Sequence, residues 1–418
     1  MYNKFNINSK ICDLAKEVNE EIKPVFSKIE EISEYNSLKV INAMQKYNLA
    51  ESHFHGTSGY GYDDNGREVI EKIYSEIFNT EDSLVRIQFV SGTHAITTML
   101  FGLLRPGDML LAATGKPYDT LDDVINGEDI GSLKDYGVNY KQIDLDENND
   151  VKIDEIVEYI KNNKVKVVEL QRSRGYSFRK SFSVSYLNNV INKIKEADSE
   201  VIIALDNCYG EFVEKQEPKA DVLVGSLIKN IGGGIASTGA YITGKSKYIE
   251  LIANRHIAPG VGKECGATLG YNKEILQGLF MAPHVVGQAI KTAVFASAMM
   301  EKMGFETSPK WNEDRADIIQ AIKFNDKEKL IKFCQGIQKG SPIDSHVVPY
   351  PWAMPGYTDE VIMAAGAFNQ GSSIELSADA PIREPFVAYM QGGLTFESGK
   401  LGIMSGASYV LNHIEGND

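Results

Sequence analysis

The sequence predicts an α/β protein: a large, mostly parallel sheet domain followed by a smaller C-terminal α+β domain. From Leu84 to Thr243, short apolar runs alternate with helix-like segments. Strands spaced by helices favour βαβ units and a parallel sheet that is covered on both faces. The chain has 418 residues, and a long apolar helical stretch ends near Gly304. This length is too great for one small core, so two domains are expected.

The N-terminal region is expected to be a helix followed by a loop. Residues 10–46 have apolar side chains at three- and four-residue spacing, which predicts an amphipathic helix. Residues 51–66 are dense in Gly, Tyr, His and Asp without a clear period, which predicts a loop. We therefore assign residues 1–66 to an N-terminal helix and arm, and helix resumes at Arg67–Phe78.

Residues 67–303 are predicted to form the large domain and residues 304–418 the small one. The strand-like runs of the large domain are LVRIQFV, DMLLAAT, VKVVEL, VIIALD, DVLVG and GAYIT, and its helix-like runs include THAITTMLFGLL, IDEIVEYIKNN and LNNVINKIKEA. The small domain has strand patterns near VVPYPW, IMAAGAF and SIELS and a last helix before His413. Ligands of a parallel sheet bind beyond the carboxyl ends of its strands, so the site is expected there.

Charge and composition exclude several classes of function. The formal net charge of −14 argues against a nucleic-acid or anionic-membrane surface. The four cysteines are scattered without CxxC spacing, which suits a reducing cytoplasm. No apolar run approaches the roughly 20 residues that span a bilayer, and the charged N-terminus does not read as a signal peptide. We expect a cytoplasmic protein without a nucleic-acid or membrane partner.

The first candidate site is VSGTHA, in which a strand runs through Ser91, Gly92 and Thr93 into a helix. The first backbone amides of a helix lack partners within the helix, and together with the helix dipole they attract anions. Gly92 would let a phosphate approach the main chain. The alternative is an ordinary strand–turn–helix with a threonine cap.

The second and third candidates are Asp206 and Lys229. Asp206 ends the apolar strand VIIALD, and Lys229 is the only charged residue in GSLIKNIGGG. A half-buried carboxylate needs a cationic partner, and burial should lower the pKa of the amine and make it nucleophilic. The alternatives are an aspartate that caps a turn and an exposed lysine on a glycine loop.

Together the three candidates match the needs of pyridoxal phosphate. This cofactor requires a phosphate seat, an anion at its ring nitrogen and a lysine for a Schiff base. Tyr118, in GKPYDT, would stack on the ring, and Ser226 would add a hydroxyl to the phosphate.

Two competing motifs are rejected. GAYITGKS matches the P-loop pattern, but a P-loop follows a strand, and no strand pattern precedes this segment. Its interior, AYIT, is β-branched and aromatic, which favours a strand over a phosphate-binding loop. His53 and His55 lack a third metal ligand at a suitable spacing, and we assign no metal site.

Several blocks of the chain resemble the pyridoxal-phosphate enzymes of Cys/Met metabolism. SHFHGTSGYGYDDNGRE, RIQFVSGTHAITTMLFGLLRPGD, TGKPYDTL and DNCYGEFVEKQEPKADVLVGSLIKN are similar to blocks of the methionine γ-lyase-like, or aluminium resistance protein, branch, which is related to cystathionine β-lyase. The resemblance runs from about Glu51 to beyond Arg383. It implies the aspartate-aminotransferase-like fold and a homotetramer, a dimer of dimers with active sites at the dimer interface.

The resemblance also implies roles for single residues. Lys229 would be the Schiff-base lysine, Asp206 the partner of the pyridine nitrogen, and Tyr118 the stacking ring. Tyr60 or Tyr62 would reach the phosphate of a neighbouring subunit, although the arginine of the family's Tyr-x-Arg is absent from SGYGYDDNGR. Arg383 is the candidate for the substrate carboxylate, with Arg174 as an alternative, because a guanidinium fork matches a carboxylate.

The leading hypothesis is a carbon–sulfur lyase that acts on a sulfur amino acid such as cystathionine, methionine or cysteine by β- or γ-elimination. The lysine, aspartate and phosphate seat do not choose among the fates of the carbanion. Transamination, γ-replacement or a non-catalytic regulator that binds the cofactor therefore remain alternatives at this point.

Overall fold

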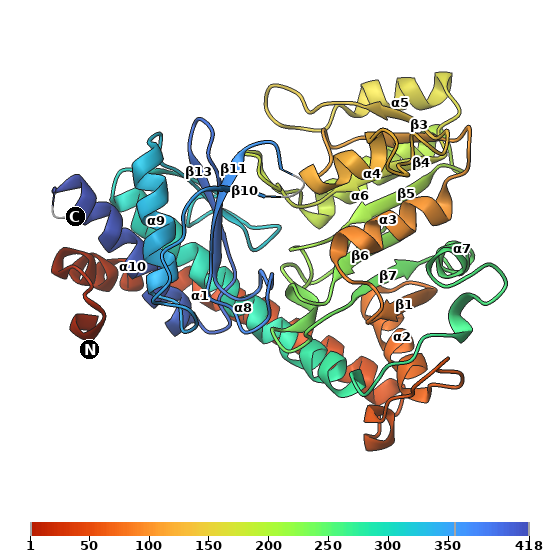
Figure 1. The fold of residues 1–418 in the computed structure, drawn as a ribbon, viewed down its shortest axis with the longest axis horizontal. Coiled ribbons are helices and arrows are strands. Elements are labelled where there is room, and N and C mark those ends of the chain that lie inside the picture. Colours follow the sequence, from red (N-terminus) through yellow and green to blue (C-terminus); the bar gives the residue numbers. More distant parts are fainter. Residues whose placement is uncertain (1, 355–356, 417–418) are drawn as a thin grey trace.

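The computed structural model describes residues 2–354 and 357–416, which form two sheets joined by two long helices. Helix α1 (Ser9–Lys46) packs along α8 (Asn272–Lys302), and both run beneath the two sheets (Figure 1). By length and composition α8 could cross a membrane, but 72% of its most apolar window is buried in this fold. The helix therefore acts as a core element that connects the two halves of the chain.

The larger sheet is mostly parallel, as predicted. Its strand order is β1-β7-β6-β5-β4-β2-β3, and β7 alone runs antiparallel to its neighbours β1 and β6. All six predicted strands of this domain are confirmed, and the edge strand β3 was missed. The strands are β1 (Asp82–Arg86), β2 (Met109–Ala112), β3 (Asn139–Gln142), β4 (Val167–Gln171), β5 (Ile202–Asp206), β6 (Val222–Ser226) and β7 (Ala240–Gly244).

The larger sheet has a separate hydrophobic core on each face. On β5, Ile202 and Ala204 pack in one core with residues of α3 (Gly92–Leu103) and α7 (Ser246–His256). The alternate residues Ile203 and Leu205 pack in the other core with α5 and α6. Burial on both faces explains why these strands read as continuous apolar runs. The remaining helices here are α2 (Asn65–Phe78), α4 (Asp122–Asn126), α5 (Ile153–Asn162) and α6 (Val184–Ala197).

The smaller sheet is antiparallel, with the order β10-β11-β12-β13-β9-β8, and packs against α9 and α10. Its sequence patterns were less reliable. Only the end of VVPYPW forms a strand, and only the last residue of SIELS, Ser377, belongs to β12. The elements are β8 (Glu306–Ser308), β9 (Gln320–Lys323), α9 (Lys327–Lys339), β10 (Trp352–Ala353), β11 (Glu360–Ala365), β12 (Ser377–Pro381), β13 (Val387–Gln391) and α10 (Phe396–Ile414).

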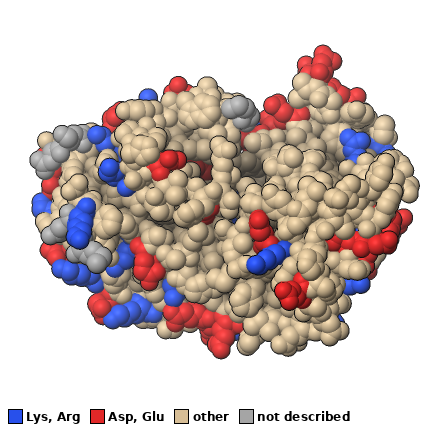
Figure 2. Space-filling model, turned by 60° about the horizontal axis from the view of Figure 1, so that its bottom comes forward, with Lys and Arg blue, Asp and Glu red and all other residues tan. Residues whose placement is uncertain are grey.

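The surface carries charges of both signs. Figure 2 shows lysine and arginine side chains interspersed with acidic ones, and uncharged residues cover much of this face. Among the described residues drawn there, no continuous basic area is seen, in keeping with the formal net charge of −14.

Candidate functional site

The predicted residues meet where the parallel strands end. Strands β5 and β6 are paired neighbours, so Asp206 at the end of β5 lies close to Ser226 at the end of β6. Five predicted residues line one pocket at this edge: Gly92, Thr93, Tyr118, Asp206 and Lys229. The pocket also contains residues that were not predicted, namely Ile96, Thr120, Leu121, Gln171, Ser173, Gly175, Cys208 and Tyr209.

The start of α3 and the end of β6 form a seat for an anion. Ser91 caps the helix, and its side chain accepts a hydrogen bond from the His94 amide at 3.1 Å. A methyl group on Gly92 would lie 3.4 Å from Ser226 Cβ, so glycine keeps this space open. The Ser226 hydroxyl is buried without a hydrogen-bond partner. An unpaired buried hydroxyl beside helix amides fits a phosphate oxygen.

Asp206 presents a carboxylate to the floor of this pocket. Its side chain is 8% exposed. Oδ1 accepts a hydrogen bond from the Cys208 amide at 3.0 Å, which fixes the orientation of the carboxylate. A buried carboxylate held in this way favours a positively charged ring N–H as its partner. The Asp206 carboxylate therefore suits the ring nitrogen of pyridoxal phosphate, and the Ser226 hydroxyl with the first amides of α3 suits its phosphate.

Lys229 is partly exposed and faces Tyr209. Its Nζ lies 4.0 Å from the centroid of the Tyr209 ring. Burial lowers the pKa of the amine, but its interactions with the titratable groups of Cys208, Tyr209 and Asp206 outweigh burial, and the net shift of the pKa is upward. The predicted lowering of the Lys229 pKa was therefore wrong. The sequence pattern showed the apolar neighbours of Lys229 but not these titratable ones.

The glycines after Lys229 allow the chain to turn against α8. A Cβ on Gly232 would lie 1.6 Å from the Leu227 carbonyl oxygen. Gly233 has a φ of 56°, and a Cβ there would lie 2.4 Å from the Gly278 carbonyl oxygen of α8. Only glycine fits this close backbone approach. The turn fixes Lys229 relative to the core helix.

Tyr118 is held from both sides. Its amide donates to Gln171 Oε1 at 2.9 Å, and its hydroxyl shares a 2.5 Å hydrogen bond with the Tyr357 hydroxyl. Burial strongly raises the pKa of Tyr118, and the nearby Tyr209 and Tyr357 add to this effect. The hydroxyl is therefore neutral near pH 7 and is able to donate a proton.

The predicted residues that do not line this pocket are Ser91 and Ser226, which lie next to Gly92, and Tyr60 and Arg383. Tyr60 is 75% exposed and stacks on Tyr62. Arg383 Nη1 donates to Asp359 at 2.9 Å, and Nη2 donates to the Tyr176 carbonyl. Arg383 is therefore paired with Asp359 and lies beside the loop that contributes Gly175 to the pocket.

Arg174, the other arginine candidate, points away from the pocket. Its Nη1 donates to the Ser308 carbonyl at 2.9 Å, while its neighbours Ser173 and Gly175 line the pocket. Among the described residues that line the pocket, Lys229 is therefore the only cation. The role of Arg383 toward a substrate carboxylate stays a prediction.

Sequence comparison places the chain in a family. The model of the family described as methionine gamma-lyase matches residues 11–411. The chain belongs to the methionine gamma-lyase family. The uncharacterized protein YnbB of Bacillus subtilis (strain 168) is 50% identical over 403 residues, which cover 95% of this chain and 96% of that protein.

Solved structures of other members of the methionine gamma-lyase family superpose closely. A protein of Clostridium acetobutylicum, described as a candidate cystathionine beta-lyase involved in aluminum resistance, is 50% identical with a TM-score of 0.95, over 98% of this chain and 97% of that chain. The carbon-sulfur lyase involved in aluminum resistance from Clostridium novyi NT is 48% identical with a TM-score of 0.94, over 97% of each chain.

A distant likeness shows the fold alone. The pyridoxal-5'-phosphate dependent protein YhfS from Escherichia coli is 16% identical with a TM-score of 0.61, over 91% of this chain and 96% of that chain. The predicted fold class, that of the pyridoxal-phosphate-dependent transferases, is thereby confirmed for this methionine gamma-lyase family member.

Two groups stand out among the residues that sequence reasoning missed. Cys208 and Tyr209 follow Asp206 directly in the chain, so the end of the VIIALD strand was a usable signal for them. Tyr176 and Tyr357 come from loops distant in sequence from one another, and no local pattern marks them. Their rings pack with centroids 5.7 Å apart next to Tyr118.

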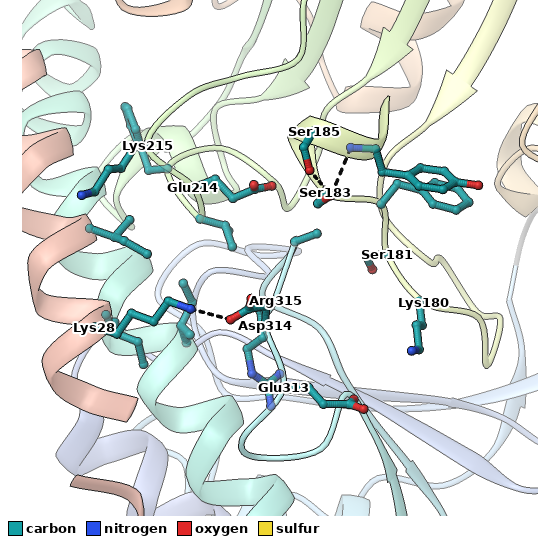
Figure 3. Close-up of a pocket in the computed structure, with 18 of the residues that line it drawn as sticks. Lys28, Lys180, Ser181, Ser183, Ser185, Glu214, Lys215, Glu313, Asp314 and Arg315 are labelled. Carbon is teal, nitrogen blue, oxygen red and sulfur yellow. Dashed lines mark hydrogen bonds and ion pairs between the residues drawn. The ribbon is translucent and has the colours of Figure 1, made fainter. Parts of the chain in front are cut away.

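This family member also has a second, larger cavity of about 610 Å³, which holds none of the predicted site residues. Figure 3 shows Lys28 of α1 paired with Asp314, and Ser183 bonded to Ser185. The Lys28–Asp314 distance is 2.6 Å. The cavity is lined by α1, α8 and four further segments, residues 148–150, 180–186, 212–215 and 313–316.

Proposed function

We propose that this chain is a pyridoxal 5'-phosphate-dependent carbon–sulfur lyase that acts on a sulfur amino acid by β- or γ-elimination. The observation that carries the proposal is that Lys229, Asp206 and Gly92 line one pocket, and that the unpartnered hydroxyl of Ser226 belongs to a side chain that lies next to Gly92. Ser226 and the amides of Gly92 and Thr93 would hold the phosphate, Asp206 the ring nitrogen, and Tyr118 the ring face. When bound, the cofactor supplies the electron sink for the charge left on the substrate Cα.

The protein side chains then move the protons. Lys229 Nζ accepts the Cα proton, and the Tyr118 hydroxyl donates a proton to the sulfur that leaves. The negative charge of Asp206 is one of the causes that raise the Lys229 pKa. A cation that binds Asp206 would offset this charge, lower the Lys229 pKa and so favour the neutral amine, which is the basic form. Arg383 would exchange Asp359 for the substrate carboxylate.

The proposal includes a homotetramer in the cytoplasm. Large apolar side chains are exposed at Tyr60, Tyr62, Val90 and Leu269. The Gly266 amide donates a hydrogen bond to the Tyr60 carbonyl at 2.8 Å, so the loop that contains Tyr60 lies against the segment that leads to Leu269. Exposed apolar patches mark association surfaces. Tyr60 would complete the phosphate site of the neighbouring subunit. The described cysteines are all free thiols, which is compatible with a reducing compartment.

The proposal is tested by product formation. The purified protein, supplied with pyridoxal phosphate, is incubated with cystathionine, methionine or cysteine, and keto acid, ammonia and thiol are measured. We expect equal amounts of keto acid and ammonia from at least one of the three. Keto acid that appears only when a second keto acid is added indicates transamination instead, and no product from any sulfur amino acid contradicts the lyase assignment.

A further inference from the structure

The Tyr60 loop, residues 56–64, is fixed along its main chain although its two tyrosine rings are exposed. The Tyr60 and Tyr62 side chains are 75% and 56% exposed, and their rings stack with centroids 5.7 Å apart. Gly61 has a φ of 67°, and a Cβ there would lie 2.5 Å from the Ala267 amide nitrogen. Only glycine allows this close approach. The loop is therefore held against the Ala267 segment while its rings face solvent.

Asp64 ties the two ends of the Tyr60 loop together. The residue is 2% exposed, and its Oδ2 accepts hydrogen bonds from the Thr57 and Thr268 hydroxyls. Its Oδ1 accepts a hydrogen bond from the Arg67 amide at 2.9 Å and so caps α2. Burial alone would raise the pKa of Asp64, but these hydrogen bonds outweigh burial, and the pKa is lowered. One ionised carboxylate therefore joins the start of the loop, its end and the segment opposite.

Arg67 fixes the main chain next to the Tyr60 ring. The residue is 3% exposed. Its Nη1 donates to the Gly61 carbonyl at 2.6 Å and to the Gly266 carbonyl at 2.8 Å, and its Nη2 donates to the Glu264 carbonyl at 3.2 Å. The Gly266 amide in turn donates to the Tyr60 carbonyl. All three acceptors of the guanidinium belong to the main chain, so Arg67 sets the path of the backbone that carries the ring.

The exposed rings share one surface with the anion seat of the same chain. Gln88 Nε2 donates to the Ala267 carbonyl at 2.7 Å, and Gln88 lies three residues before Ser91, which caps α3. Val90, between these two residues, is 78% exposed. Exposed apolar groups on a fixed support mark an association surface. A closed dimer uses the same patch on both subunits, so a ring that leaves one copy would meet the anion seat of the other. The partner that fits is a second copy of this chain.

We propose that Asp64 and Arg67 are positioning residues, which hold the Tyr60 loop in the shape in which Tyr60 binds the cofactor phosphate of a second copy of this chain. This inference rests on the proposed function. Both side chains are buried within their own chain, so they act through Tyr60 and do not touch the cofactor. A substitution of either residue in one chain should therefore weaken cofactor binding in the neighbouring chain.

The experiment uses mixed assemblies of two variant chains, Lys229→Ala and Arg67→Met. The chains are co-expressed with different affinity tags, and assemblies that carry both tags are kept. The visible band of bound pyridoxal phosphate reports the chain that keeps Lys229, which is the Arg67→Met chain. Where its neighbour is a Lys229→Ala chain, the Tyr60 loop that reaches it is intact.

Assemblies of Arg67→Met alone should bind pyridoxal phosphate about 10- to 100-fold more weakly, because the Tyr60 hydroxyl loses its hydrogen bond to a charged group. In the mixed assemblies, titration with pyridoxal phosphate should show a class of sites with the wild-type affinity. If only the weak class is seen, Arg67 acts on the pocket of its own chain and the inference is overturned. A wild-type affinity in Arg67→Met alone overturns it as well.

Two further variants keep the test sharp if a change at the buried Arg67 impairs folding. Tyr60→Phe removes one hydroxyl from a largely exposed side chain, and Asp64→Asn keeps the size of the side chain. Each variant alone should bind the cofactor weakly, and each should regain a tight class of sites in mixtures with Lys229→Ala. A normal affinity in Tyr60→Phe beside a weak one in Asp64→Asn would show that the loop does not act through Tyr60, and would overturn the inference.

The matched control is Arg105→Met. The Arg105 guanidinium also donates to main-chain carbonyls, those of Gly102 and Leu104 at 2.9 and 2.7 Å, but it lies at the other end of α3. Its loss should leave the affinity for pyridoxal phosphate unchanged. An equal loss of affinity in Arg105→Met and Arg67→Met would contradict the specific role of Arg67.

These readouts are cofactor affinities and need no turnover. If the wild-type protein binds pyridoxal phosphate but eliminates none of the sulfur amino acids, the proposed lyase function fails. The mixed assemblies then still decide whether Arg67 and Asp64 act on the neighbouring chain.

Discussion

The cavity between α1 and α8 and the smaller pocket at the strand ends differ in how their polar groups are satisfied. The larger one is lined by ion pairs such as Lys28–Asp314 and Lys215–Glu31, whose side chains are largely exposed. Arg315 is the exception, since its Nε and Nη1 lack partners. The smaller pocket at the strand ends combines an amine, a carboxylate and an unpaired hydroxyl.

This contrast teaches that volume does not identify a reactive site. Solvated ion pairs neutralise each other and contribute little. Buried polar and titratable side chains that face one another lower the free energy of unfolding, and they are found mainly where they bind a ligand or take part in a reaction. Substitutions in the small pocket should therefore change the rate of the reaction, and substitutions in the cavity between α1 and α8 should not.

The largest effect is expected from Lys229→Ala. Removal of the amine removes both the attachment point of the cofactor and the base for the Cα proton, so lyase activity should fall by about 10²–10⁴-fold or more. The fresh wild-type protein should have a visible absorbance band that borohydride removes, and the variant should lack it. A variant that keeps this band would show that another amine holds the cofactor. It would then contradict the conclusion that the small pocket is the reactive site.

A smaller effect is expected from Ser226→Ala. A hydrogen bond to a charged group contributes about 1.5–3 kcal/mol, so affinity for pyridoxal phosphate should weaken by about 10- to 100-fold. Binding is measured by fluorescence titration of the protein freed of cofactor. The stability of that protein should not fall, because the buried hydroxyl has no partner to lose.

Ser297→Ala is the matched control for Ser226. The Ser297 hydroxyl is buried too, but it donates to the Pro309 carbonyl at 3.1 Å and bonds with Thr307. Its removal should lower the free energy of unfolding by about 1 kcal/mol and leave cofactor affinity unchanged. Equal affinities in the two variants would contradict the assignment of Ser226 to the phosphate.

The sequence predicted those parts of the site that depend on local order along the chain. Asp206 and Lys229 each follow a fully apolar strand, and parallel strands bring their carboxyl ends to one edge, so their meeting was foreseeable. Tyr357 reaches the site from the small domain through tertiary packing, which leaves no periodic signal. The sign of the Lys229 pKa shift was missed for the same reason, because it depends on side chains that only the fold brings together.

The small domain was also harder to predict as structure. Apart from the edge strand β3, the strands of the large sheet are buried on both faces and stand out as apolar runs, whereas β12, SADAP, has small and polar residues. SIELS has the stronger strand pattern, yet β12 begins only at its last residue, Ser377, because antiparallel pairing with β11 and β13 selects the register. Arg383 follows β12, so its pairing with Asp359 could not be read from neighbouring letters.

The smallest effect is expected from Lys28→Met in the larger cavity. The Lys28 and Asp314 side chains are 62% and 89% exposed, and such pairs contribute roughly 0–1 kcal/mol. We expect kcat/KM for the best sulfur amino acid to stay within about twofold of the wild-type value. The free energy of unfolding, measured by chemical denaturation, should stay within about 0.5 kcal/mol of it. A clear loss of activity without unfolding would show that the cavity between α1 and α8 is coupled to the Lys229 pocket through the core helix. It would also show that an exposed ion pair can affect activity in this fold.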